Sequence, residues 1–170
     1  MSTGSALLLT VLAAVAMCVA VSAASRRPDA AWNYYYFDGR AFVAGRPVGD
    51  SPFLAVRDRD VPLVLTRAAR AVATPLPSDK GALAGICFLR SSGGKLAGSG
   101  GHTPLPGKSV TIYSSDQVVM SVTSDEKGYF VALLPAGVYR IGSGAFTAEA
   151  TVETGKTTLA AVQAGKRMVD

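Results

Sequence analysis

The fold is decided by the stretch Lys108-Ser109-Val110-Thr111-Ile112-Tyr113 and by the alternating runs that follow it. In an extended chain, Val110 and Ile112 lie on one side, and Thr111 and Tyr113 lie on the other. Alternation of this kind indicates a strand with one buried face and one solvated face. The pattern recurs in four further runs, whose apolar residues are Val118, Met120 and Val122; Phe130, Ala132 and Leu134; Tyr139 and Ile141; and Ala148, Ala150 and Val152.

Turn-forming residues separate these runs. The separators are Ser114-Ser115-Asp116, Asp125-Glu126-Lys127-Gly128, Pro135-Ala136-Gly137, Gly142-Ser143-Gly144 and Thr154-Gly155-Lys156. Strands begin about every ten residues, and no gap has a helix-length pattern. We therefore predict an all-β fold, an antiparallel β-sandwich of about seven strands. The last run, Thr157 to Gln163, shows no clear inward face.

Three motifs in this half resemble the carboxypeptidase regulatory-like domain, which is a transthyretin-like (prealbumin-like) β-sandwich. They are Pro104-Leu105-Pro106-Gly107-Lys108-Ser109-Val110, Thr123-Ser124-Asp125-Glu126-Lys127-Gly128-Tyr129-Phe130 and Leu134-Pro135-Ala136-Gly137-Val138-Tyr139. They stand in the family's order, and the similarity covers residues 81–165. We expect Gly128 and Gly137 at turns that need positive φ or close backbone approach, and Phe130 and Tyr139 in the core.

The resemblance implies a noncatalytic module that serves in folding, docking or spacing. Two features depart from the family pattern. Ser124 stands where the family often has Asp, and the Gly- and Ser-rich stretch from Arg90 to Thr103 is longer than the usual connection. We interpret that stretch as a mobile loop.

The N-terminus reads as an export signal. Residues 6–23 are uncharged and largely apolar, small residues follow, and Arg26-Arg27-Pro28 ends the run. We predict that residues 1–24 are a signal peptide and that this leader is helical. Two alternatives remain open: an uncleaved anchor, since 18 apolar residues can span a bilayer, and lipidation at Cys18. After cleavage Cys87 is the only cysteine, and its apolar surroundings favour a buried, inert thiol.

Residues 25–80 form an aromatic, turn-rich extension with a Pro-rich linker. Asp38-Gly39 between two apolar runs predicts a two-residue β-hairpin. Pro62 restricts its run to an edge strand. The stretch from Thr66 to Thr74 predicts a short helix. The sandwich domain then occupies residues 81–170.

Seven of the 13 aromatic residues lie between Trp32 and Phe53. The candidate partner-binding residues are Trp32, Tyr34, Tyr35, Tyr36 and Phe37. Three interpretations stay open: packing on the sandwich, an aromatic or sheet-edge surface for another protein, and stacking on the sugars of a polysaccharide. Adjacent tyrosines in a strand must face opposite sides.

No catalytic set is recognisable. The one histidine, His102, lies among glycines and reads as a solvated loop residue. The pair Asp125-Glu126 reads as a solvated hairpin turn rather than a Ca²⁺ site. We predict no metal, no cofactor and no catalytic residue. The 17 basic and 12 acidic residues form no stripe, which argues against nucleic acid as a partner.

The sequence therefore predicts an exported protein, in the periplasm, at the cell surface or outside the cell. We expect a noncatalytic structural or protein-interaction module whose partner is another envelope or surface protein or a second copy. A carbohydrate-binding module that uses Trp32 and Tyr34–Tyr36 is the alternative. Membrane contact is expected only through an uncleaved or lipidated N-terminus.

Overall fold

Strands make up all the regular structure of the described residues, which are 31–93 and 101–169 of a computed structural model. The signal peptide, the leader helix and Cys18 lie outside these residues. The strands of the N-terminal part are β1 (Asn33–Phe37), β2 (Phe42–Ala44), β3 (Phe53–Val56) and β4 (Leu63–Leu65). Those of the C-terminal part are β5 (Lys80–Gly93), β6 (His102–Pro104), β7 (Ser109–Ser114), β8 (Gln117–Thr123), β9 (Tyr129–Pro135), β10 (Gly137–Ser143), β11 (Phe146–Val152) and β12 (Thr157–Val169).

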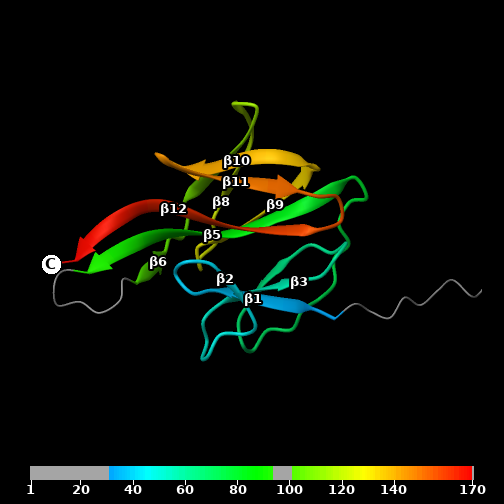
Figure 1. The fold of residues 1–170 in the computed structure, drawn as a ribbon. Coiled ribbons are helices and arrows are strands. Elements are labelled where there is room, and N and C mark those ends of the chain that lie inside the picture. Colours follow the sequence, from blue (N-terminus) through cyan, green and yellow to red (C-terminus); the bar gives the residue numbers. More distant parts are fainter. Residues whose placement is uncertain (1–30, 94–100, 170) are drawn as a thin grey trace, which may run out of the picture. The chain divides into compact units, whose positions relative to one another are not determined.

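The strands form three sheets. The N-terminal sheet has the order β2-β1-β3-β4, and the C-terminal sheet has the order β11-β10-β7-β8. Between them lies the central sheet, in which β5 pairs with β12 on one side and with β9 and β6 on the other. Figure 1 shows the three layers, with β1 to β3 in blue to cyan below, β5 and β12 in the middle, and β10 and β11 above.

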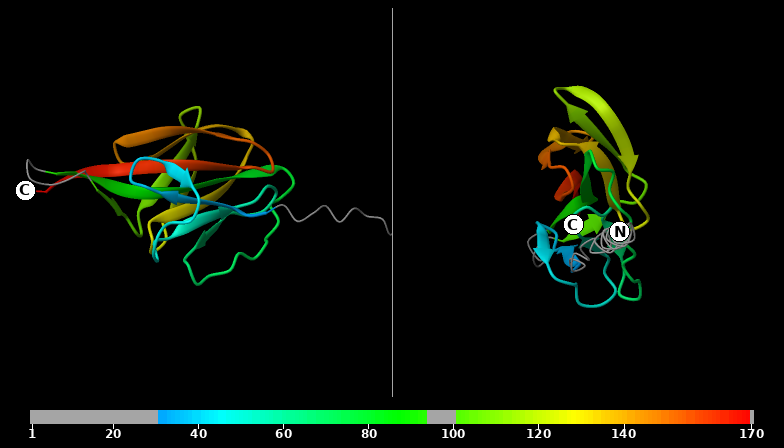
Figure 2. Two further views of the ribbon diagram at one scale, coloured as in Figure 1. Left: turned by 60° about the horizontal axis from the view of Figure 1, so that its bottom comes forward. Right: turned by 90° about the vertical axis from the view of Figure 1, so that its right-hand side faces the viewer.

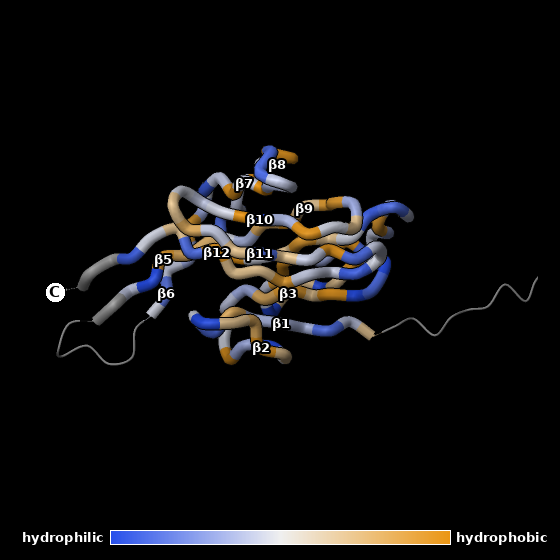
Figure 3. The backbone as a smooth tube through the Cα atoms, turned by 45° about the horizontal axis from the view of Figure 1, so that its top comes forward, coloured by the Kyte–Doolittle hydropathy of each residue, from blue (hydrophilic) through white to orange (hydrophobic). Residues whose placement is uncertain are grey.

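The central sheet is buried on both faces, because each face contacts another sheet. Leu83 and Cys87 of β5 pack against the C-terminal sheet. Ala84 and Ile86 of the same strand pack against the N-terminal sheet. A strand covered on both sides needs no polar face. This explains the unbroken apolar run of residues 81–89 (Figure 3).

Strand β12 has the same double burial. Its residues Ala160 and Val162 belong to the C-terminal core, and Leu159 and Ala161 contact the N-terminal core. The run therefore has no single inward face. The pairing of β12 with β5 is parallel, whereas the other ladders are antiparallel. The all-β prediction is confirmed, and the central and C-terminal sheets are consistent with the predicted sandwich. The structure differs in the parallel β5–β12 pair and in the N-terminal sheet, which adds a third layer.

The strands predicted in the C-terminal half are confirmed. A two-residue turn, Ser115-Asp116, joins β7 to β8, and φ is +46° and +67° at these residues. Two positive φ values match the twist that a tight hairpin needs. Val119 is the extra residue of a bulge, because Ile112 pairs with Met120 while Tyr113 pairs with Val118.

The turn before β9 is built from side-chain hydrogen bonds. The Asp125 carboxylate accepts from the Lys127 and Tyr129 N–H groups, both at 2.8 Å. Gly128 has φ +80°, as predicted. The prediction for Gly137 is wrong in part: it is a strand residue without positive φ. Tyr139 lies in the core, and its hydroxyl donates to the Pro135 carbonyl at 3.0 Å.

Two local predictions in the N-terminal part need correction. The hairpin between β1 and β2 has a four-residue loop, since Phe37 pairs with Phe42. The Asp38 carboxylate caps this loop by accepting from the Arg40 and Ala41 N–H groups.

The helix predicted from Thr66 to Thr74 does not form. The segment has one turn, in which the Ala69 N–H donates to the Thr66 carbonyl. It is then held extended, because the Val61 N–H donates to the Thr74 carbonyl. A helix this short is only marginally stable unless it packs against other elements. Pro62 precedes β4, which is an edge strand as predicted.

Candidate functional site

Four of the five candidate partner-binding residues lie on the two faces of β1, and Trp32 directly precedes this strand. Tyr35 and Phe37 face the central sheet. Trp32, Tyr34 and Tyr36 face away from it. The alternation expected for adjacent tyrosines is therefore present, and it divides the set into an inner pair and an outer trio.

The inner pair belongs to the contact between layers. Phe37 is 6% exposed, and its ring centroid lies 4.7 Å from that of Phe88 on β5. A second contact ties the start of β3 to the central sheet: the Tyr129 hydroxyl donates to the Pro52 carbonyl at 3.2 Å. Burial raises the pKa of Tyr129 to about 12. The N-terminal sheet is thus packed on the sandwich through an apolar core.

The outer trio forms a second, smaller cluster. Its buried members are Phe53, Ala55 and Leu65, and Trp32, Tyr34, Tyr36, Leu63 and Ala71 pack against them. Tyr34 and Phe53 meet edge to face with ring centroids 5.6 Å apart. The three outer rings are half-buried. We call this surface the outer aromatic face.

Two arginines lie over the outer aromatic face. The Arg46 guanidinium carbon is 4.0 Å from the centroid of Tyr34, and that of Arg57 is 4.6 Å from the centroid of Trp32. Arg57 also pairs with the buried Asp60 carboxylate. Cation–π contacts of this kind hold a guanidinium in place. The Arg57 side chain is 16% exposed and is engaged by Asp60, whereas no ion pair of the described residues includes Arg46. Sequence reasoning missed both arginines as parts of the site.

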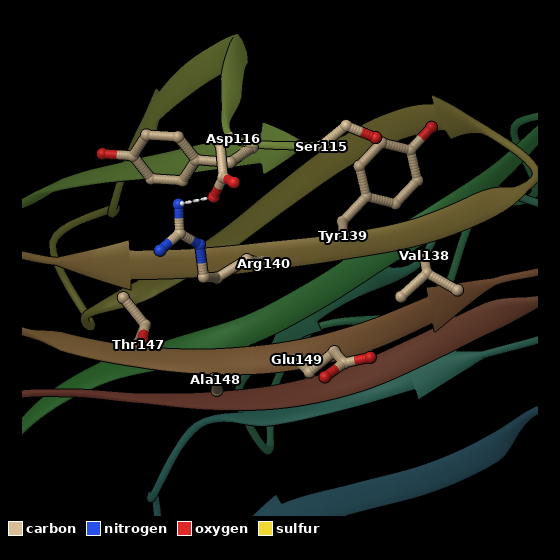
Figure 4. Close-up of a pocket in the computed structure, with 9 residues that line it drawn as sticks. Ser115, Asp116, Val138, Tyr139, Arg140, Thr147, Ala148 and Glu149 are labelled. Carbon is tan, nitrogen blue, oxygen red and sulfur yellow. Dashed lines mark hydrogen bonds and ion pairs between the residues drawn. The ribbon is translucent and has the colours of Figure 1, made fainter.

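A second candidate site is a recess on the outer face of the C-terminal sheet (Figure 4). It has a volume of about 440 Å³, and its lining includes Tyr113, Asp116, Val138, Arg140 and Glu149. The Arg140 guanidinium donates to the Asp116 carboxylate at 2.8 Å and lies 4.9 Å from the Tyr113 centroid. The recess combines an aromatic ring, a cation and two carboxylates.

His102 is not a solvated loop residue, so that prediction is wrong. It begins β6 and pairs with Arg90. Its half-buried ring meets Phe37 edge to face, with centroids 4.9 Å apart. Burial lowers its pKa, and Asp38 opposes this effect. The predicted loop from Arg90 to Thr103 is likewise strand at both described ends.

The other groups with chemical potential are separated from one another. Cys87 is buried in the C-terminal core, and desolvation raises its pKa. Asp125 is engaged by backbone N–H groups of its own turn. Across residues 31–93 and 101–169, no three His, Cys, Asp or Glu side chains gather as metal ligands would. In the same residues, no helix is long and apolar enough to cross a membrane.

The chain matches no protein-family model and no curated protein.

Proposed function

We propose that the protein is an exported, noncatalytic interaction module that binds a partner protein through its outer aromatic face. The observation that carries the proposal is the seating of Arg46 and Arg57 over Tyr34 and Trp32. Trp, Tyr and Arg are the residues that contribute most at protein interfaces. A sheet presents them in fixed positions, which lowers the entropy lost on binding.

The same contacts favour a protein over a saccharide at this face. Sugar stacking needs a free aromatic ring face. Guanidinium groups already lie over the rings of Trp32 and Tyr34. A protein partner can instead use the N–H groups of Arg46 together with the ring edges.

Export and the family resemblance support the class of function. The apolar leader with small residues after it is the signal for export. The three motifs that resemble carboxypeptidase regulatory-like domains imply a noncatalytic role. Within the described residues, the His102 ring packs against the Phe37 and Phe88 rings, and the nearby Asp38 carboxylate accepts hydrogen bonds from the backbone of its own loop. A partner from the cell envelope, or a second copy, is the expected ligand.

A capture experiment tests the proposal. The purified protein is used as bait for an envelope fraction, and its own association is measured by analytical ultracentrifugation. We expect a stable complex that a Tyr34→Ser/Tyr36→Ser variant loses. Tyr113→Ser is the matched control, because Tyr113 is a half-buried tyrosine on the opposite outer sheet. The proposal would be contradicted if the wild type and both variants bound the partner equally well, or if no complex formed at all.

The Tyr113–Arg140 recess favours carbohydrate binding as a second candidate function. A ring beside a guanidinium and two carboxylates offers stacking and paired hydrogen bonds to neighbouring hydroxyl groups. Polysaccharide pelleting tests it. In this case Tyr113→Ser should abolish retention, and Tyr34→Ser/Tyr36→Ser should not. Pelleting that is unaffected by Tyr113→Ser would remove this candidate.

A further inference from the structure

The loop between β2 and β3 has a backbone shape that only certain residues allow. Gly45 has φ +121° and Gly49 has φ +83°, values that favour glycine. Pro47 between them restricts its own φ. The Gly45 N–H also donates to the Tyr34 carbonyl at 2.8 Å. These constraints place Arg46 beside the outer aromatic face.

Arg46 rests on two rings. Its guanidinium carbon lies 4.0 Å from the Tyr34 centroid and 5.7 Å from that of Phe53. These rings form the edge-to-face pair described above, and Phe53 is 3% exposed. A guanidinium that is already held in place loses less side-chain entropy when it binds a ligand.

A pocket opens beside this arginine. Its volume is about 280 Å³, and it is lined by Arg46, Pro47, Val48, Gly49, Phe53 and Arg67. Its walls between the two arginines are apolar or backbone. The ion pairs of the described residues are Arg57–Asp60, Arg140–Asp116 and Lys156–Glu153. Arg46 and Arg67 therefore bring two positive charges to one pocket with no carboxylate of the described chain paired to either.

We propose that this pocket binds a side-chain carboxylate of an acidic segment on the partner protein. The inference rests on the proposed function and specifies the partner's chemistry. A planar carboxylate matches the fork of N–H groups that an arginine presents. Phe53 supplies a buried apolar wall beside the arginines, where a carboxylate is less hydrated than in bulk water. Two unpaired cations gain most from an anion that bridges them.

A polypeptide is the favoured source of the carboxylate. Phe53 lines the pocket and is also a buried member of the outer aromatic cluster, so the two surfaces are continuous. A peptide can place an acidic side chain in the pocket and apolar side chains along the rings. An acidic polysaccharide offers the same carboxylate, but its sugars would meet a ring that Arg46 already covers.

Titration with defined probes tests the proposal. The full-length protein is titrated by calorimetry with an acetylated glutamate-rich peptide that also contains tyrosine, and separately with polygalacturonate. NMR of the arginine Nε–H groups reports which arginines respond. We expect the peptide to bind and to shift the Arg46 and Arg67 signals. Arg46→Gln and Arg67→Gln should each weaken binding by about tenfold, the cost of one charge-assisted contact.

The control is Arg70→Gln. Arg70 is an exposed arginine three positions beyond Arg67, and it does not line the pocket. It should change binding less than about twofold. Arg46→Lys keeps the charge without the fork and should fall between the wild type and Arg46→Gln. Thermal unfolding of each variant confirms that it is folded.

Three results would overturn the inference. Equal losses for Arg70→Gln and Arg46→Gln would show attraction by charge alone. Binding of polygalacturonate but not of peptide would assign the pocket to an acidic polysaccharide. Capture of the envelope partner that survives Arg46→Gln but fails for Tyr34→Ser/Tyr36→Ser would remove this inference and leave the proposed function standing.

Discussion

The two outer sheets cover opposite faces of the same central sheet, yet they are built differently. Strands of the N-terminal sheet have three to five residues, and aromatic side chains occupy both of its faces. Strands of the C-terminal sheet have six or seven residues, with mainly aliphatic side chains and Tyr139 inside and mostly polar ones outside. Aromatic rings bury a large apolar area per residue, so even short strands can pack stably against the central sheet.

The edges of the two sheets differ as well. The N-terminal sheet ends in β2 and β4, which have three residues each. The C-terminal sheet ends in β8, which has seven residues and neither a charge nor a proline. Val118 and Val119 of β8 are 61% and 47% exposed. Figure 2 shows the β7–β8 hairpin extending away from the other strands. A long apolar edge of this kind can pair with another chain.

The largest expected effect tests whether both outer sheets are held equally well. Leu83→Ala and Ile86→Ala remove fully buried side chains from opposite faces of β5. Each should lower the free energy of unfolding by about 2–5 kcal/mol, measured by urea denaturation. Val72→Ala, at a site that is 69% exposed, is the control. A much smaller loss for Ile86→Ala would mean that the N-terminal sheet is only loosely docked.

A smaller loss of stability is expected on substitution of Ser124, whose side chain holds the segment that leads into β7 of the C-terminal sheet. Its buried hydroxyl donates to the Leu105 carbonyl at 2.6 Å and accepts from the Lys108 N–H at 2.9 Å. Ser124→Ala should cost about 1–3 kcal/mol in chemical denaturation, because both partners lose a hydrogen bond. Ser121→Ala, at an exposed serine of β8, should be nearly neutral. Similar values for both variants would contradict this assignment.

Between pH 5 and pH 8, a pH-dependent effect is expected where His102 meets Phe37 of the N-terminal sheet. Its pKa in the folded protein lies below the ordinary value of 6.5. The neutral ring is therefore favoured by folding. The contribution to stability is fully present above pH 6.5 and is lost as the pH falls from there through the folded pKa.

Denaturation between pH 8 and pH 5 measures this slope. His102→Gln should remove most of it, because glutamine does not titrate. Asp38, whose pKa lies below 3.8, stays charged over this range. An unchanged slope in the variant would place the pH dependence elsewhere.

The smallest change in stability is expected at the β8 edge. Val119→Lys places a charge on an exposed bulge residue and should alter the free energy of unfolding by less than about 0.5 kcal/mol. It should nevertheless reduce association during heating, as followed by light scattering, because a lysine discourages edge pairing. Val72→Lys adds the same charge away from any strand. If both variants reduce association equally, net charge rather than the edge is responsible.

The different burial of the outer and central sheets also explains which strands could be predicted from the sequence. Strands β7, β10 and β11 were predictable, because each has one buried face and one more exposed face and so alternates. The residues of β5 and β12 carry no alternation, because both of their faces are buried. The sequence therefore left packing of the N-terminal segment on the sandwich as only one of three interpretations. The place of His102 could not be predicted, because the glycines before it are typical of a loop and its partner Phe37 is remote in sequence. The alternate facing of Tyr34 and Tyr35 was predictable from strand geometry alone.

The arginines of the candidate site could not be found in the same way. Arg46 reaches Tyr34 and Phe53 only after β1, β2 and β3 have paired. The only local signal is the pair of glycines, Gly45 and Gly49, around Arg46-Pro47. They indicate a tightly turned loop, but they do not indicate which residues the loop contacts. Arg67 lies in a segment that was predicted to be helical, where its side chain would have taken a different direction.

The parallel pairing of β5 with β12 has a consequence for how the chain acquires its structure. Its register joins Ala82 to Thr157, so most of the sandwich sequence lies between the two partners. Contacts so remote along the chain form slowly, on the millisecond-to-second scale typical of all-β proteins. Until β12 arrives, β5 lacks a neighbour on one side. We therefore expect the last strand to be the slow step of refolding, and the interval before it to be the period when a chaperone is most useful.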